Sequence, residues 1–393
     1  MALDKPILIA GGGIGGLASA MALAQKNIRS VVLEKAQRLG EIGAGIQLGP
    51  NAFHCFDRLG VGETARKMAV YIDSLRLMDS MADGEICHVD LGEAFRKRFG
   101  NPYAVVHRGD LHGVLLKACQ DHPLVELRVS SEVTGYDQDG KGVAARLANG
   151  ETVRGAALVG ADGLWSNVRK QMIGDSARVS GHTTYRSVIP TEQMPEDLRW
   201  NAATLWAGPK CHIVHYPLSG WKVFNLVVTY HNDAPEPVAG KPVPVEEVRR
   251  GFGHVCERAQ NIIRHGRDWH MWVLCDRDPV NDWIDGRVAL LGDAAHPMLQ
   301  YMAQGACMAM EDAVCLADSL SRHAGSLETG LSNYRDRRLL RTARVQLTSR
   351  AMGDHVYHPA GPHAALRNAI MSGKSQAEWL DALEWIYGGN GLD

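Results

Sequence analysis

A glycine cluster near the N-terminus is the clearest sign of chemistry in this sequence. Residues 11–16 read Gly-Gly-Gly-Ile-Gly-Gly and satisfy the spacing G-x-G-x-x-G, between an apolar run at 6–10 and an alanine-rich segment typical of a helix. In this context Gly11 permits a tight turn, Gly13 lets the backbone approach a pyrophosphate, and Gly16 lets helix and strand pack closely. Because the helix N-terminus offers free N–H groups to an anion, the cluster predicts a dinucleotide site.

Three acidic side chains extend this prediction. Glu34 ends a second apolar run, 34 − 11 = 23 positions after Gly11, where an acid can bind a ribose hydroxyl. The pairs Asp162-Gly163 and Gly292-Asp293 each follow an apolar run, at 157–160 and 287–291. Open α/β sheets bind ligands beyond the carboxyl ends of their strands, so we expect the three loops to meet. One Rossmann unit alone fits FAD or NAD, whereas three such loops in this order favour FAD.

A second group of residues could perform acid–base chemistry on an aromatic ring. His212 and Tyr216 lie in an alternating run and share one face of the expected strand, whereas His215 points the other way. An imidazole has an unperturbed pKa near ~6.5 and can accept a phenol proton at neutral pH. Gln300 can donate a hydrogen bond to a phenolate or carboxylate, and Tyr103 is a candidate for lining the same pocket.

The elements that must position these residues form two kinds of sheet. Apolar runs alternate with helical segments near both ends of the first 350 residues, whereas short alternating runs and six of the nine tryptophans fall in the middle. We therefore expect an α/β protein with a Rossmann-type FAD-binding domain, an inserted β-rich substrate domain and a helical C-terminal region. The expected boundaries are 1–73, 100–180 and 276–345 for the first, 74–99 and 181–275 for the second, and 346–393 for the third.

Composition excludes several other classes of protein. Lys plus Arg total 42 and Asp plus Glu total 44, so the net charge of -2 offers no footprint for nucleic acid. No apolar stretch reaches the about 18 residues that a membrane span needs. The eight cysteines are scattered without a C-x-x-C pair, which predicts neither a disulfide framework nor a metal site and favours the cytoplasm.

The chain resembles a known family over nearly its whole length. The resemblance rests on residues 11–16 with Glu34, on residues 160–163 and on residues 292–297. These motifs are similar to those of the family of single-component flavoprotein aromatic hydroxylases. Para-hydroxybenzoate and salicylate hydroxylases are among its members. The resemblance implies FAD as cofactor, NADH or NADPH and O2 as co-substrates, and a homodimer.

The resemblance also implies which residues hold the cofactor. Glu34 would serve the ADP half, Asp162 and Gly163 both FAD and the nicotinamide, Asp293 the flavin ribityl chain, and Arg108 the region near the flavin. Pro297 would fix a loop backbone against the flavin. The expected cofactor-binding residues are Gly11, Gly13, Gly16, Glu34, Arg108, Asp162, Gly163, Gly292, Asp293 and Pro297.

Two further sequence segments, residues 206–217 and 296–305, indicate the substrate through their resemblance to family members. They are most similar to family members that act on 3-hydroxybenzoate, which implies that His212, Tyr216 and Gln300 act on the substrate. We expect His212 to take the phenol proton and a flavin C4a-hydroperoxide to hydroxylate the ring para to the hydroxyl, giving 2,5-dihydroxybenzoate (gentisate). Salicylate or 6-hydroxynicotinate are alternative substrates. A NAD-dependent dehydrogenase or a non-catalytic flavin-binding protein are the alternatives of another class.

Overall fold

The first layer of the molecule is a six-stranded sheet. The structure is a computed structural model that describes residues 4–40, 45–389 and 392. The strand order is β19-β20-β12-β1-β2-β8, and all neighbours are parallel except β19 and β20. The strands are β1 (Ile7–Ala10), β2 (Ser30–Leu33), β8 (Val125–Arg128), β12 (Ala157–Gly160), β19 (Ile284–Asp285) and β20 (Val288–Leu290).

This sheet is parallel because its central strands are apolar on both faces. Every residue of β1, β2, β12 and β20 is buried, as a parallel sheet covered by helices requires. The covering helices are α1 (Ile14–Ala24), α5 (Arg108–Asp121) and α9 (Gly305–Arg322), and α1 contacts both of the others. Since β20, β12 and β1 are neighbours, the loops at their carboxyl ends lie together. The expected α/β fold is confirmed.

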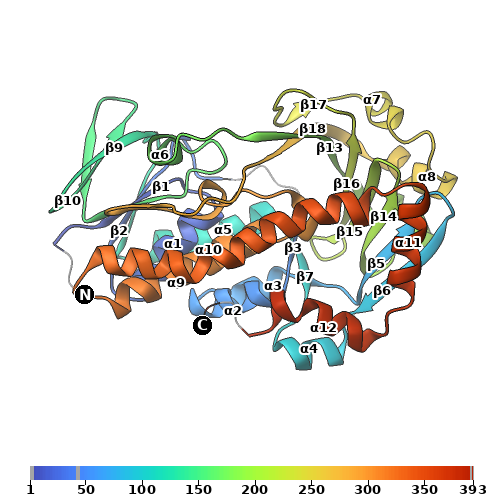
Figure 1. Cartoon of the computed structure of the whole chain (residues 1–393), viewed down its shortest axis with the longest axis horizontal. Helices are drawn as coiled ribbons and strands as arrows, with labels where there is room; N and C mark the ends of the chain where they lie inside the picture. The colour runs from blue at the N-terminus through green and yellow to red at the C-terminus, as the bar shows by residue number, and fades with distance from the viewer. Residues whose placement is uncertain (1–3, 41–44, 390–391, 393) are drawn as a thin grey trace.

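A second, eight-stranded sheet lies beside the first (Figure 1). Its order is β17-β18-β13-β16-β15-β14-β5-β6, antiparallel throughout except between β14 and β5. The strands are β5 (Ser74–Asp79), β6 (Gly84–Asp90), β13 (Arg178–Pro190), β14 (Ala202–Gly208), β15 (Cys211–Leu218), β16 (Val223–His231), β17 (Lys241–Pro242) and β18 (Arg267–Asp276). Apart from the start of β13 (residues 178–180) and the last residue of β18 (Asp276), these strands fall within the two stretches expected to form the substrate domain; the division into domains itself stays a prediction.

Smaller elements complete the body of the molecule. Two three-stranded sheets are built from β3 (Gly45–Leu48), β7 (Ala104–His107) and β4 (Val70–Tyr71), and from β9 (Val133–Asp139), β10 (Gly142–Leu147) and β11 (Thr152–Gly155). The remaining helices of this part are α2 (Pro50–Arg58), α3 (Gly62–Met68), α4 (Glu93–Phe99), α6 (Asn167–Met172), α7 (Val245–Arg250) and α8 (Glu257–His265). Two short 3-10 turns, η1 (Thr191–Gln193) and η2 (Glu196–Leu198), connect β13 to β14, and two more, η3 (Gly292–Ala294) and η4 (Gln300–Met302), lie between β20 and α9.

The C-terminal part is helical and joins the two large sheets. The long helix α10 (Leu327–Met352) packs on α9 and runs from the six-stranded sheet toward the eight-stranded one (Figure 1). A π-helical turn, η5 (Gly353–Tyr357), continues α10 and contacts β14. It is followed by α11 (Gly361–Ser372) and α12 (Gln376–Tyr387), which pack on β6 and α4. Among the described residues, no helix is both long and apolar enough to cross a bilayer.

A buried ion cluster ties α9 and α10 to the loop after β20. Arg338 donates to Glu311 (2.6 Å) and to Asp312 (2.7 Å), and all three side chains are buried. Asp312 also accepts from the Gly292 N–H (3.0 Å). Removing one partner from such a buried pair leaves an uncompensated charge, so the cluster fixes where this loop lies.

Candidate active site

One cavity connects the three strand-end loops of the first sheet with β15 of the second. Its volume is about 1020 Å³, at the upper end of the range for ligand pockets. Gly11 and Glu34 line one part, and His212 and Tyr216 line another. The convergence expected from the sequence is therefore present, and the space takes a ligand much larger than a single aromatic ring.

The glycine loop after β1 has the geometry that its motif predicts. Gly11 has a φ of +102°, which side-chain-bearing residues rarely adopt, and a Cβ there would collide with the Ala161 carbonyl. A Cβ at Gly16 would collide with the carbonyl oxygen of Gly11, so Gly16 lets α1 pack against the turn. Gly13 lines the cavity directly, whereas Gly16 is not among the described residues that line it.

Two acidic residues near this loop are engaged by backbone N–H groups. Glu34 accepts from Gly12 (2.6 Å) and Ala36 (2.8 Å), and it also lines the cavity. Asp162 accepts from the Ser166 hydroxyl (2.5 Å) and from the Asn167 N–H (2.8 Å), so it caps α6 while lining the cavity with Gly163. Burial raises the pKa of Asp162 despite these hydrogen bonds. Glu34 and Asp162 therefore both line the cavity, and their expected contact with the cofactor stays a prediction.

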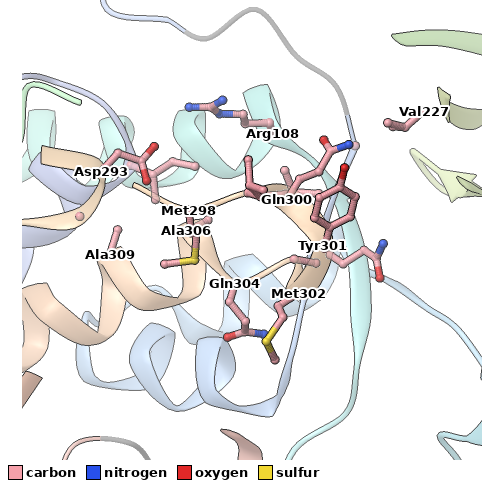
Figure 2. A pocket seen from close by; sticks show the side chains of 18 of the residues that line it. Arg108, Val227, Asp293, Met298, Gln300, Tyr301, Met302, Gln304, Ala306 and Ala309 are labelled. Atoms are coloured by element: carbon pink, nitrogen blue, oxygen red, sulfur yellow. The ribbon is translucent and has the colours of Figure 1, made fainter. Parts of the chain in front are cut away.

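The loop after β20 brings an exposed carboxylate to the cavity. Gly292 has a φ of +61°, and Asp293 points into the space that Arg108, at the start of α5, also lines (Figure 2). Pro297 behaves differently: it is not among the described residues that line the cavity, and its carbonyl accepts from Gln346 (3.2 Å). The expected contact between Pro297 and the flavin therefore stays a prediction without direct support from the cavity wall.

The strand β15 presents His212 and Tyr216 on the same face, as its period-two pattern predicts. Both side chains are buried and line the cavity together with Val214. His215 lies on the other face, where its Nε2 accepts from the Trp206 indole N–H (3.2 Å). Burial lowers the pKa of His212 well below its ordinary value, and the imidazoles of His358 and His182 lower it further. His212 is therefore neutral at physiological pH, so one of its ring nitrogens is unprotonated.

Gln300 and Tyr103 complete the predicted set. The Gln300 amide donates to the hydroxyls of Thr184 and Thr229, each at 3.2 Å, which fixes which way its amide points. Tyr103 is buried, lines the cavity and donates to Gln47 (2.7 Å). The structure thus gathers all four predicted substrate-site residues at one cavity, while their roles stay predictions.

Comparison with known proteins decides the family. Residues 4–349 match the protein family described as "FAD binding domain". Over 387 residues the chain is 56% identical to "3-hydroxybenzoate 6-hydroxylase 1" of Aquipseudomonas alcaligenes, with 98% of each chain covered. It is 48% identical to "3-hydroxybenzoate 6-hydroxylase" of Polaromonas naphthalenivorans (strain CJ2), with 98% of this chain and 96% of the relative covered. The chain belongs to the FAD-binding hydroxylase family. This excludes the NAD-dependent dehydrogenase considered from the single Rossmann unit.

Solved structures agree with this fold. The chain superposes on a "Salicylate hydroxylase substrate complex" with a TM-score of 0.83 and 23% identity, covering 98% of this chain and 96% of that one. It also matches Klebsiella pneumoniae HpxO "complexed with FAD and uric acid" with a TM-score of 0.83 and 23% identity, covering 96% and 95%.

FAD is the cofactor of this hydroxylase, and the cavity fits it. The left-handed turn at Gly11 and the bare backbone at Gly13 leave room for a pyrophosphate beside the N-terminus of α1. From there the cavity continues past Arg108 and Asp293 to the substrate-site residues, as an elongated dinucleotide requires. The hydroxylase presents a cation and a carboxylate midway along this path.

Arg186 is a site residue that the sequence analysis missed. It lies on β13, lines the cavity and donates to the Gln300 side-chain oxygen (3.1 Å). Within the part of the chain that the structure describes, no carboxylate lies within ion-pair distance of its guanidinium, and burial lowers its pKa. Nothing in the local sequence pattern of β13 marked this arginine. Its importance follows from the absence of a neighbouring carboxylate, which only the folded structure shows.

The C-terminal part supplies further site residues that were not predicted. Tyr357, Trp379, Trp385 and Tyr387 all line the cavity, and His358 lies 2.7 Å from His212, between His358 Nε2 and His212 Nδ1. The tail therefore forms one wall of the cavity. Its aromatic residues were visible in the sequence, but only the path of α10 and the turn after it brings them to β15.

Proposed function

We propose that this hydroxylase converts 3-hydroxybenzoate to 2,5-dihydroxybenzoate (gentisate), using NADH or NADPH and O2. The names of its relatives support this substrate. The observation that carries the proposal is the pairing of an unneutralised cation, Arg186, with a neutral base, His212, in one cavity. A phenolic acid offers a carboxylate to the first and a phenol proton to the second.

Arg186 would anchor the substrate carboxylate. A half-buried guanidinium with no carboxylate beside it is poorly compensated, so a ligand that brings a carboxylate gains more there than a neutral ligand does. The planar guanidinium can donate two parallel hydrogen bonds to a carboxylate. Gln300, held by Thr184 and Thr229, would orient the anchored acid from the side.

His212 would act as the general base on the phenol. Its Nδ1 is in contact with His358, which leaves Nε2 for the substrate. Removing the phenol proton pushes electron density onto the ring, above all to the carbon para to the oxygen. Tyr216 and Tyr103 would hold the ring and its oxygen atoms in place. The buried, largely apolar part of the wall would keep water from the reacting carbon once substrate and cofactor fill the cavity.

The cofactor end would be held by the strand-end loops. We assign Glu34 to the ribose, Gly11 and Gly13 to the pyrophosphate, Asp293 to the ribityl chain and Arg108 to the flavin region. When bound, FAD supplies the redox chemistry that activates oxygen and delivers a hydroxyl to the ring. The protein residues bind, orient and shield the reactants.

Assembly and setting form a separate part of the proposal. We expect a homodimer in the cytoplasm, acting in the breakdown of aromatic acids through gentisate. Large apolar side chains are exposed on α10 and α11 and favour an interface there: Leu340, Leu347, Leu366 and Ile370. Light scattering of the purified protein gives the oligomeric state, and a monomer at micromolar concentration would contradict this part.

A substrate panel tests the reaction. Purified, FAD-loaded protein is mixed with NADH or NADPH and with 3-hydroxybenzoate, salicylate or 6-hydroxynicotinate, and O2 uptake and products are followed. We expect 3-hydroxybenzoate to stimulate O2 uptake most, with NMR placing the new hydroxyl para to the first. Preferred turnover of salicylate, or of 6-hydroxynicotinate as in the relative named for that substrate, would contradict the proposal.

A further inference from the structure

A buried histidine on α5 contacts the glycine loop from the side opposite the cavity. The Nε2 of His112 lies 2.8 Å from the carbonyl oxygen of Gly12, and both residues are buried. A carbonyl oxygen can only accept a hydrogen bond, so the hydrogen of this contact is on His112 Nε2. Neither His112 nor Gly12 is among the described residues that line the cavity. His112 therefore reaches the cavity wall only through the backbone of the loop.

We propose that His112 is a positioning residue for FAD, which holds the peptide between Gly12 and Gly13 so that the Gly13 N–H points at the pyrophosphate. The inference rests on one part of the proposed function, the assignment of Gly11 and Gly13 to the pyrophosphate. It is independent of which aromatic acid is hydroxylated. His112 acts through the backbone and is not a catalytic residue.

The direction of the Gly13 N–H follows from the planarity of the peptide bond. In a trans peptide, the carbonyl of one residue and the N–H of the next residue point in opposite directions. The Gly12 carbonyl points toward His112, whereas Gly13 lines the cavity. The Gly13 N–H therefore points to the cavity side of the loop.

This N–H is open to an anion. Within residues 4–40, 45–389 and 392, the Gly13 N–H has no hydrogen-bond partner. Gly13 is the N-cap of α1, and no side chain caps this helix. An N-terminus without a side-chain cap leaves its first N–H groups to a ligand, and the helix dipole favours a negative charge there.

The glycines of the loop make an external contact of this kind necessary. The three consecutive glycines Gly11, Gly12 and Gly13 lack the Cβ atoms that restrict backbone dihedral angles, so the peptides between them rotate at little steric cost. Two side chains from outside the loop remove this freedom. Glu34 accepts from the Gly12 N–H at 2.6 Å, and His112 donates to the Gly12 carbonyl at 2.8 Å. Both polar groups of Gly12 are thus engaged, which fixes the direction of the adjoining Gly13 N–H.

The helix α5 brings His112 to the loop through its contacts with α1. Arg108 begins α5 and lines the cavity, and His112 follows four positions later, about one helical turn on. Leu115 and Cys119 continue the same buried face, and the Cys119 Sγ donates to the Leu17 carbonyl at 3.4 Å. This second bond also joins α5 to α1, but it ends on a carbonyl inside α1, away from the loop. The two bonds allow positioning of the loop to be separated from packing of the helices.

Ligand binding to the cofactor-free protein tests this role without turnover. FAD is removed from the full-length protein, and the dissociation constant of FAD is then measured from the change in flavin fluorescence. Those of ADP and adenosine are measured by titration calorimetry. ADP carries two phosphates next to the nucleoside, whereas adenosine carries none. A loss of affinity for ADP alone therefore reports on the phosphate contacts.

The decisive variant is His112→Phe, which keeps a ring but has no N–H to donate. Because the peptide is then free to rotate, we expect the dissociation constants of FAD and ADP to rise by at least about tenfold, as the loss of one hydrogen bond to a charged group implies. The dissociation constant of adenosine should change little. His112→Gln, whose amide can still donate to the carbonyl, should restore binding of FAD and ADP nearly to that of wild type.

Cys119→Ala is the matched control for helix packing. It removes the other side-chain bond from α5 to α1 and should lower the melting temperature without changing the dissociation constant of FAD. An equal loss of ADP and adenosine binding in His112→Phe would overturn the proposal, because it would indicate a general distortion. A loss of FAD binding in Cys119→Ala as large as in His112→Phe would overturn it too. His112→Leu takes the place of His112→Phe if the latter does not fold.

The wild type separates this inference from the proposed function. If ADP does not bind the cofactor-free wild type, the assignment of Gly11 and Gly13 to the pyrophosphate and the role of His112 are both wrong. If ADP binds the wild type and His112→Phe binds FAD and ADP equally well, only the role of His112 is wrong. Neither result depends on whether 3-hydroxybenzoate is the substrate.

Discussion

The imidazole Nε2 of His296 lies 2.5 Å from the carboxylate Oδ2 of Asp312, and both side chains are fully buried. The same carboxylate receives Arg338 from α10 and the Gly292 N–H from the cofactor loop. One carboxylate on α9 thus joins the C-terminal helices to the loop that presents Asp293. We therefore expect stability and cofactor retention to be coupled through Asp312.

Asp312→Asn should reveal this coupling. The substitution keeps the shape but leaves Arg338 short of one charge, and breaking a buried pair costs about 3–5 kcal/mol. Urea unfolding should show that loss in the free energy of unfolding, and the purified protein should retain less FAD. Lys67→Gln, which removes an exposed ion pair with Glu63, should change the free energy of unfolding by under about 1 kcal/mol. Equal effects of the two substitutions would contradict the coupling.

Acid should destabilise the protein partly through Asp312. Burial alone would raise the pKa of this carboxyl, but His296 and Arg338 lower it to about 2. A carboxyl with a lowered pKa in the folded state stabilises above its ordinary pKa, and that contribution is lost as the pH falls toward 2. Between about pH 4 and pH 2, Asp312→Asn should therefore lose less stability than wild type in urea titrations. A steeper loss in the variant would contradict this assignment.

Arg186→Gln should discriminate between charged and neutral ligands. A charge-assisted hydrogen bond contributes about 1.5–3 kcal/mol, so binding of 3-hydroxybenzoate should weaken roughly ten- to hundredfold. Binding of 3-hydroxybenzyl alcohol, which lacks the carboxylate, should change little. Flavin absorbance titrations measure both constants, with Arg178→Gln, on an arginine paired with Asp276, as the control. An equal loss for both ligands would indicate a general packing defect.

His212→Ala should bind FAD yet hydroxylate slowly. Loss of a general base typically costs a factor of about 10²–10⁴ in rate, and consumption of NADH or NADPH should exceed product formation. Because the pKa of His212 is well below its ordinary value, wild-type kcat/KM should also show no inflection near pH ~6.5 from this residue. Coupled O2 and product measurements check both expectations. Full product yield from His212→Ala would remove His212 from the role of base.

Gly16→Ala should abolish cofactor binding, because its Cβ would collide with the Gly11 carbonyl. The absorbance of the purified protein in the flavin bands, and the shift of the melting temperature on adding FAD, both report this loss. Gly113→Ala is the matched control: it lies in α5 with nothing within 4 Å of the added atom. It should bind FAD normally and gain about 0.5–1 kcal/mol from helix propensity.

The sequence could predict those parts of the site that depend on local rules. Gly11 follows from a turn that only glycine adopts easily, and the meeting of Asp162 and Asp293 follows from the rule for parallel strand ends. The shared face of His212 and Tyr216 follows from the two-residue period of a strand. Each of these inferences needs only a few neighbouring residues.

Other features depend on long-range contacts and could not be predicted in this way. His358 stands 146 positions from His212 in the sequence, and no periodicity joins a helical tail to a strand of the second sheet. Arg186 matters because no carboxylate accompanies it, which is a property of the folded surroundings. Pro297 was expected at the cavity because it follows a motif, yet the chain turns its carbonyl to Gln346 instead.

The pairing of β1 with β12, and of β12 with β20, has a consequence for how the protein is made. The strand at residues 7–10 acquires its second neighbour only after residue 157 has been synthesised, and the sheet gains β20 only after residue 288. The last wall of the cavity arrives with Tyr387. A nascent chain on the ribosome therefore carries an open, apolar sheet edge for most of its synthesis. Shortened chains that stop before α12 should aggregate or depend on chaperones rather than accumulate as colourless but folded protein.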